Sequence, residues 1–291
     1  MHYSGSVVRP PHEANSILLE VTVGCSHNKC GFCHYYREDK FRPAPMAQIE
    51  ADLAEVRSVW PAADRVFVLG ADAFVLSYKR LKKVIEKINR YLPFASIGMY
   101  ARISNIRNKT VDELRVLRSM RVNDLVIGVE SGDDDVLAMV NKGNNAYDIV
   151  EQCRKLEEAG IAYRIIYLGG LAGRGGGEKN ALASARVFNQ IHPTHLMLTS
   201  LTLMPGSDLY HYALQGKFVE ATEMERMQET LTLIGNLDNQ IIILGNHVSN
   251  ALAFNALLPR DKRAVMEMLE QAINDFDEDK HRKRRQMLRN I

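Results

Sequence analysis

The sequence predicts an α/β fold built from parallel strands, each followed by a helix. Three observations support this prediction: short apolar runs alternate with amphipathic stretches, the runs are almost continuously apolar, and residues such as Gly24 and Gly160 end the segments. Alternating β and α elements form parallel sheets with right-handed crossovers. A barrel or partial barrel accommodates six such units better than an open sheet does.

The expected elements follow one another in regular order. Strands are predicted where β-branched, apolar runs are bounded by turn residues, at 17–23, 65–69, 96–101, 125–129, 163–168 and 195–203. Helices with apolar periodicity are predicted at 46–59, 78–91, 147–159 and 178–191. Another helix begins at Thr110, where Glu113 completes a capping box. The remainder is mostly helical with one strand at 240–244, so we expect a barrel core at 1–206 and a helical C-terminal appendage at 207–291.

Composition and charge narrow the class of protein. The 291 residues are 46% hydrophobic and 25% charged, and the net charge of +2 gives no support for a nucleic-acid partner. No apolar run reaches the roughly 18 residues that a membrane span requires, and no signal peptide is recognisable at residues 1–16. We therefore expect a cytoplasmic protein. Acidic and then basic residues at 275–285 predict a solvated helix face or a surface that binds an acidic partner.

Three of the four cysteines fall within nine residues. Cys25, Cys30 and Cys33 follow the first strand with the spacing C-x4-C-x2-C, which is typical of a metal site rather than a disulfide framework. Thiolates suit an iron–sulfur cluster or zinc, and His27 or His34 could supply a fourth zinc ligand. Three thiolates around a cubane cluster would instead leave one iron open to a cofactor.

This loop resembles that of the radical S-adenosylmethionine (SAM) superfamily. Members usually carry C-x3-C-x2-C with an aromatic residue before the third cysteine, and Phe32 stands at that position. The first spacer here is one residue longer, as in variant members. The strand ends that follow resemble the branch related to oxygen-independent coproporphyrinogen oxidase, and the similarity covers about residues 16–215.

The resemblance assigns roles to further residues. Gly70, Ala71 and Asp72 match the motif that binds the SAM amino group, although Ala71 and Asp72 replace glycine and glutamate. The G-x-E-S-G block places Glu130 at the SAM ribose, and Arg164 corresponds to an arginine that pairs with the SAM carboxylate. The other cofactor-binding positions that the resemblance implies are Phe32, Ser104 and Leu203.

What the resemblance implies is a partial (β/α)6 TIM-like barrel with a [4Fe–4S] cluster and SAM as cofactors. An electron from reduced flavodoxin or ferredoxin would pass through the cluster and cleave SAM to methionine and a 5′-deoxyadenosyl radical. That radical would abstract a hydrogen from a small-molecule substrate, with a tetrapyrrole-like compound as one candidate. The resemblance identifies no catalytic acid or base.

Substrate contacts and competing functions stay open at this point. Residues that could line a substrate pocket are Tyr35, Tyr36, His195 and His247. A non-enzymatic iron–sulfur redox sensor or cluster carrier is the main alternative, and a zinc-stabilised binding module is a further one. Neither alternative requires the glycine, glutamate and arginine motifs at the strand ends, so these motifs favour the enzyme.

Overall fold

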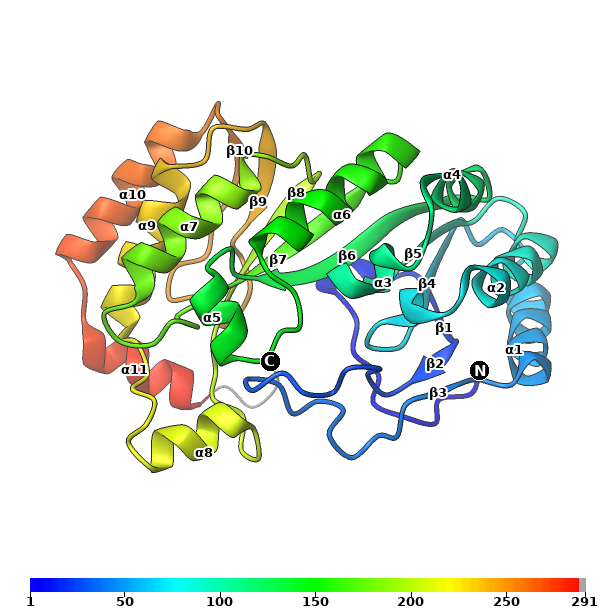
Figure 1. The fold of residues 1–291 in the computed structure, drawn as a ribbon, viewed down its shortest axis with the longest axis horizontal. Helices are drawn as coiled ribbons and strands as arrows, with labels where there is room; N and C mark the ends of the chain where they lie inside the picture. The colour runs from blue at the N-terminus through cyan, green and yellow to red at the C-terminus, as the bar shows by residue number, and fades with distance from the viewer. Residues whose placement is uncertain (288–291) are drawn as a thin grey trace. The chain divides into compact units, whose positions relative to one another are not determined.

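The computed structural model describes residues 1–287, which fall into two compact units. The first unit comprises Met1–Asn28, Tyr35–Gly128 and Arg154–Tyr163, and the second comprises Lys29–His34, Val129–Cys153 and the described residues from Arg164 onward. Both are built from parallel strands and helices (Figure 1). Within residues 1–287, no helix combines the length and the apolar composition needed to cross a membrane.

The first unit contains four parallel strands in the order β1-β4-β5-β6. Phe67 and Ile97 are fully buried, so apolar side chains fill the space between strands and helices. The strands are β1 (Ile17–Glu20), β4 (Arg65–Leu69), β5 (Ser96–Ala101) and β6 (Val122–Glu130), and the helices include α1 (Met46–Val59), α2 (Tyr78–Tyr91), α3 (Ile103–Arg107) and α4 (Val111–Ser119).

Local sequence signals account for these helices. The Ser77 hydroxyl accepts from the Arg80 amide at the start of α2, whose buried residues follow helical spacing. The predicted capping box of Thr110 and Glu113 is present at the start of α4 and is confirmed. The helices predicted at 46–59 and 78–91 are confirmed over their full lengths.

The first predicted strand is broken in two. Strand β1 ends at Glu20, and β2 (Thr22–Val23) pairs with β3 (Arg42–Pro43) in a separate antiparallel ladder. The amide of Val21 still donates to Leu69 O, so the chain leaves the parallel sheet only after this residue. The cysteine loop therefore lies between the two strands of a short hairpin.

The second unit continues the alternation of strands and helices. Strands β7 (Tyr163–Gly169), β8 (His195–Ser200) and β9 (Ile241–Leu244) are parallel, and β10 (Asn255–Leu258) is antiparallel to β9. Helices α7, α9 and α10 pack against one another beside these strands (Figure 1). The remaining helices are α5 (Asp134–Met139), α6 (Ala146–Ala159), α7 (Gly177–Phe188), α8 (Asp208–Leu214), α9 (Glu223–Gly235), α10 (Lys262–Asn274) and α11 (Glu278–Gln286).

The structure confirms the α/β fold class and refines its C-terminal part. The predicted strand at 240–244 is present as β9, and its parallel pairing with β8 makes it an extension of the sheet. Strand β10 was missed, because a four-residue run reading NALL carries little β-branched signal. Strand β8 ends at Ser200, three residues earlier than predicted. Segment 207–287 lies in the second unit with β7 and β8, so the units divide the chain differently from the boundary expected at residue 206.

Candidate functional site

The cysteine loop begins at a glycine turn. Gly24 has a φ of +72°, and a Cβ atom there would lie 2.7 Å from the carbonyl of Asp39, so glycine is required. Cys25 belongs to the first unit, whereas Cys30 and Cys33 belong to the second. None of the three forms a disulfide, and all three are partly exposed. Thiols in this state are accessible to a metal cluster, which fits the donor set that the spacing predicts.

Asp72 holds the start of this loop. Its carboxylate is completely buried and accepts from the Ser26 amide at 3.0 Å, from the Ser26 hydroxyl and from Asn105 Nδ2 at 3.5 Å. Burial raises the pKa of Asp72. Burial, and then the charge of Asp72, also raises the pKa of Cys25, so a thiolate there needs a compensating cation. The Asp72 side chain thus anchors the residue next to Cys25 rather than presenting a free carboxylate.

The turn that carries Asp72 is fixed by a close backbone approach. Gly70 follows β4 with a φ of +124°, and a Cβ atom on it would lie 1.9 Å from Thr22 Oγ1. No other residue fits there without moving β2. Ala71 follows as a partly exposed residue. The peptide carbonyls of this turn, rather than the Asp72 carboxylate, are therefore the acceptors that the turn can offer to an ammonium group.

Ser104 lies in the first turn of α3, directly after β5. Arg102 is the N-cap residue of this helix, and Asn105 lies at its third position, where its Oδ1 accepts from the Arg102 amide at 2.7 Å. Ser104 forms no part of this cap. Within residues 1–287 the Ser104 hydroxyl has no hydrogen-bond partner, and the side chain is half-buried.

Glu130 ends β6 in a left-handed conformation, with a φ of +70°. It is 8% exposed, and its Oε1 lies 2.9 Å from the ammonium of Lys142, which is 5% exposed. The same ammonium lies 5.6 Å from the centre of the Phe32 ring. Among residues 1–287 no other group donates to the Glu130 carboxylate, and Asp133 rather than Glu130 caps the following helix. This arrangement leaves Oε2 of Glu130 available to a ligand hydroxyl.

Lys142 was missed by sequence reasoning. It follows α5 in a stretch reading N-K-G that is typical of a turn, and both neighbours adopt positive φ: +52° at Asn141 and +82° at Gly143. These two left-handed residues, one on each side of Lys142, turn the chain sharply. The lysine between them is buried beside Glu130. The available sequence signal was the turn-like N-K-G stretch, which holds this lysine twelve residues after Glu130.

A buried hydrogen-bond network supports the ends of β6 and β7. Asn180 accepts from the Ser131 hydroxyl and donates to Glu229 Oε1 at 2.8 Å, while the Gly170 amide donates to Glu229 Oε2 at 2.7 Å. The Tyr167 hydroxyl donates to the same carboxylate. Burial raises the pKa of Glu229 and that of Tyr167. Such fully satisfied networks rigidify the backbone that presents neighbouring functional groups.

Phe32 and Leu203 lie against one apolar cluster in the second unit. Both are partly buried, and both pack on the same set of buried side chains. Gly31 is tied to this cluster through its amide, which donates to Val140 O at 2.8 Å, and through its carbonyl, which accepts from Leu209 N at 2.8 Å. The members of the cluster are Val136, Val140, Leu171, Leu201, Leu209 and Phe218.

Arg164 does not lie where the resemblance implied. It is the second residue of β7 and is in register with His195, the first residue of β8, whereas Gly169 and Ser200 end these strands. Both therefore lie at the amino edge of the sheet, about 17 Å along the strand from its carboxyl end at roughly 3.3 Å per residue. The prediction that Arg164 lies at a carboxyl strand end is wrong, and His195 is excluded from that edge by the same pairing.

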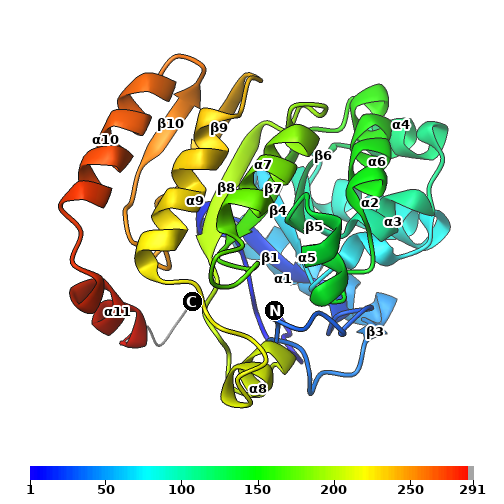
Figure 2. The same cartoon turned by 60° about the vertical axis from the view of Figure 1, so that its left-hand side comes forward.

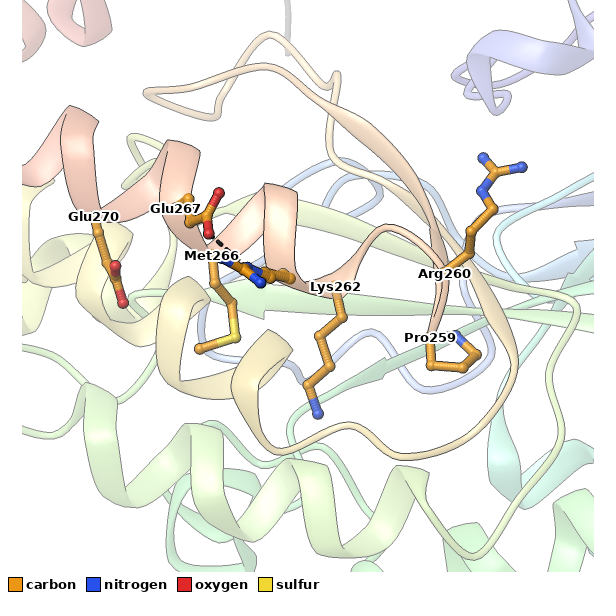
Figure 3. A pocket seen from close by; sticks show the side chains of 7 residues that line it. Pro259, Arg260, Lys262, Met266, Glu267 and Glu270 are labelled. Atoms are coloured by element: carbon orange, nitrogen blue, oxygen red, sulfur yellow. Dashed lines mark hydrogen bonds and ion pairs between the residues drawn. The ribbon is translucent and has the colours of Figure 1, made fainter.

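Two other features also lie at amino edges. A hollow of about 410 Å³ is lined by residues from Pro259 to Glu270, including Lys262 and Met266, beside the start of β9 (Figure 3). In the first unit, the Arg65 guanidinium forms ion pairs with both Glu13 and Asp124 and so neutralises these two carboxylates. Ligands of parallel α/β folds bind at the carboxyl ends of strands, so neither feature is the candidate site.

Comparisons with known proteins agree with this geometry. A family model described as the radical SAM superfamily matches residues 19–174, more than half of the chain. The heme chaperone HemW of Bacillus subtilis (strain 168) is 23% identical over 201 residues, covering 66% of this chain and 52% of HemW. The chain therefore spans about half the length of that relative.

Solved structures share the fold at low identity. The coproporphyrinogen III oxidase HemN from Escherichia coli, a radical SAM enzyme, gives a TM-score of 0.58 at 16% identity and covers 76% of this chain and 52% of its own. The methyltransferase TsrM from Kitasatospora setae, with cobalamin and a [4Fe–4S] cluster bound, gives 0.55 at 15%, covering 66% and 35%. The chain belongs to the radical SAM superfamily, and its cofactors are a [4Fe–4S] cluster and SAM.

Proposed function

We propose that this chain is an enzyme that reductively cleaves SAM at a [4Fe–4S] cluster and acts on a small-molecule substrate. The observation that carries the proposal is the set of three partly exposed cysteines with C-x4-C-x2-C spacing inside the segment matched by the superfamily model. When bound, the cluster supplies the electron that splits SAM into methionine and a 5′-deoxyadenosyl radical. In this proposal, reduced flavodoxin or ferredoxin delivers that electron, and the protein works in the cytoplasm.

The ligands that we propose for the cluster are Cys25, Cys30 and Cys33. The fourth cysteine, Cys153, is fully buried in α6 and serves as a small apolar residue. Three protein thiolates leave one iron for SAM, which fits a cofactor that chelates through its amino and carboxylate groups. In this scheme Asp72 orients the Cys25 turn through Ser26.

The SAM-binding roles that we propose follow from hydrogen-bonding capacity. Glu130 accepts from ribose hydroxyls through the oxygen that Lys142 leaves open, while Lys142 holds the other oxygen in an ion pair. The peptide carbonyls of Gly70 and Ala71 accept from the SAM amino group. Phe32 and Leu203 contribute apolar surface, and Ser104 contributes a hydroxyl. Arg164 has no part in this proposal, because it lies at the amino edge.

A second candidate function is a non-enzymatic iron–sulfur protein, namely a redox sensor or a carrier. The similarity to HemW supports this candidate, because that relative is named a heme chaperone and not an enzyme. Such a protein would keep a reducible cluster without consuming SAM. The two candidates therefore differ in one product, 5′-deoxyadenosine.

The experiment that tests the proposal starts from protein purified without oxygen and reconstituted with iron and sulfide. Reduction with dithionite and addition of SAM should yield 5′-deoxyadenosine. Cys30→Ala should remove both the four-iron spectrum and the product, because one of three thiolates is lost. Cys153→Ala is the matched control and should retain both. A reducible cluster that leaves SAM intact would instead favour the sensor or carrier.

A further inference from the structure

The loop between β9 and β10, residues 245–254, is fastened to the carboxyl end of β8. The Ser200 amide donates to Ser249 Oγ, and the Ser200 hydroxyl donates to Asn250 Oδ1, both at 2.9 Å. Asn250 Nδ2 donates in turn to Leu198 O at 2.9 Å and to Gly245 O at 2.8 Å. The loop is thus fixed at the edge of the parallel strands where α/β proteins bind ligands.

His247 in this loop is held in one tautomer. Its Nδ1 lies 3.3 Å from the Ser249 amide nitrogen and 2.7 Å from Ser249 Oγ. An amide nitrogen can only donate, so Nδ1 is the accepting nitrogen and the neutral ring carries its proton on Nε2. Ser249 Oγ already accepts from Ser200, which leaves its own proton for Nδ1. Burial lowers the pKa of His247, so the ring is neutral at pH 7.

The proton on Nε2 is left without an acceptor. Within the part of the chain that the structure describes, no residue accepts a hydrogen bond from this nitrogen, although the His247 ring is half-buried. The other polar side chains of the loop named above, Ser249 and Asn250, form hydrogen bonds with residues of the second unit. His247 therefore presents a fixed hydrogen-bond donor beside the ends of β8 and β9.

Helix α11 brings positive charge to the same loop. Arg285 is buried against Glu223 and donates from Nη2 to Ser249 O at 2.7 Å, while Arg284 Nη1 lies 3.5 Å from Ala251 O. These carbonyls are two and four residues beyond His247. Figure 2 shows α11 following α10 near the start of α9, where Glu278 accepts from the amides of Glu223 and Met224.

The positive charge of α11 is not neutralised locally. Arg282, Lys283 and Arg284 are exposed, and none forms an ion pair with residues 1–287. Two acidic residues of this segment are engaged by backbone amides: Glu278 caps α9, and Asp277 caps α11 itself. A neutral donor flanked by uncompensated cations favours a ligand with an anionic oxygen.

We propose that the loop 245–254 and α11 form a binding site for an anionic oxygen group, a carboxylate or a phosphate, carried by the substrate. His247 Nε2–H donates to that oxygen, and the exposed cations of α11 attract the anion. The assignment of this ligand to the substrate rests on the proposed function. The binding of the anion itself does not, because neither the cluster nor SAM takes part.

The test uses the full chain labelled with ¹⁵N in the histidine rings. His247→Asn identifies the signal of His247 among those of the nine histidines. Sodium acetate and inorganic phosphate are titrated separately at constant ionic strength and constant pH. We expect the His247 signal to show the Nε2–H tautomer and to shift saturably with at least one anion. Saturation by acetate alone identifies a carboxylate, and saturation by phosphate alone identifies a phosphate.

Charge variants keep the test decisive if His247→Asn fails to fold. Arg284→Gln should weaken anion binding about fivefold, as expected for one unit charge near the site in water. Arg263→Gln is the matched control, because Arg263 is 92% exposed at the opposite edge, and it should leave binding unchanged. An Nδ1–H tautomer, no saturable shift with either anion, or equal weakening in the two arginine variants would overturn the proposal. This anion titration does not depend on SAM cleavage, so its result can be interpreted even if the protein forms no 5′-deoxyadenosine.

Discussion

Asp72 after β4 and Glu130 at the end of β6 are both carboxylates at strand ends, but their surroundings differ. Asp72 is saturated by the protein, since it accepts from the Ser26 amide, the Ser26 hydroxyl and Asn105. Among residues 1–287, Glu130 receives one donor, the ammonium of Lys142. We therefore expect a strand-end acid to bind a ligand only where the chain leaves some of its acceptor capacity unused.

The largest expected effect concerns the buried cation that distinguishes the two sites. Lys142→Met should lower the free energy of unfolding by about 3–5 kcal/mol, because it leaves the Glu130 carboxylate buried without its partner. Urea denaturation measures the change. The double variant Glu130→Gln/Lys142→Met should recover most of the loss. Lys82→Met removes an exposed ion pair with Glu86 and should have no measurable effect; equal losses in both single variants would break the comparison.

The second prediction separates the roles of the two carboxylates in SAM binding. Glu130→Gln should weaken SAM binding by about 1–3 kcal/mol, because a charge-assisted hydrogen bond to the ribose is lost. Asp72→Asn should change the SAM dissociation constant by less than about threefold, since its oxygens face Ser26 and Asn105. Equilibrium binding to reconstituted protein measures both. The reverse order of effects would reassign Asp72 as the SAM ligand.

A smaller effect is expected on the stability of the Asp72 turn. Asp72→Ala should cost about 1–3 kcal/mol, because buried donors lose their acceptor. Asp72→Asn retains a carbonyl oxygen for the Ser26 amide and should cost less than the alanine variant. Urea denaturation of the two variants provides the comparison. Equal stability of Asp72→Ala and the parent protein would show that the hydrogen bonds to Ser26 and Asn105 contribute nothing.

The smallest effect is expected for Lys109, which is linked to Asp72 through Asn105. Its ammonium donates to Phe74 O at 2.7 Å and to Asn105 O at 3.3 Å, and burial lowers its pKa to about 8 from the usual 10.5. Between these values the unfolded chain binds more protons than the folded one, so this group makes stability rise with pH. The stability difference between the parent protein and Lys109→Met should therefore grow from pH 8 to 10. Lys83→Met, at an exposed position, should show no such trend, and a flat difference for Lys109→Met would contradict the assigned pKa.

Much of the fold was predictable because local signals and tertiary packing agree. The helix at 78–91 has a serine cap and regular apolar spacing, and both survive in α2. Strand β4 is a continuous apolar run buried on both faces. The failures occur where pairing decides the outcome. The run at 17–23 divides because Thr22 and Val23 find partners in β3, a segment with no strand signal of its own.

The candidate site was only partly predictable, because sequence shows which residues end a strand but not which donors surround them. Glu130 was named correctly as a strand-end residue, yet its partner Lys142 lies twelve positions away in an apparent turn. Arg164 was placed at the wrong edge, because the start and the end of a seven-residue strand are close in sequence but far apart in space. Donor counts and strand register require coordinates.

Formation of 5′-deoxyadenosine by the reconstituted parent protein, Asp72→Asn and Glu130→Gln at limiting and at saturating SAM tests the account most directly. We expect product from the parent protein and from Asp72→Asn at similar rates. Glu130→Gln should be slow at limiting SAM and recover at saturating SAM. Absence of product from a parent protein that holds a reducible four-iron cluster and has been reduced with dithionite would contradict the proposed chemistry. Loss in Asp72→Asn alone would contradict the distinction between the two carboxylates.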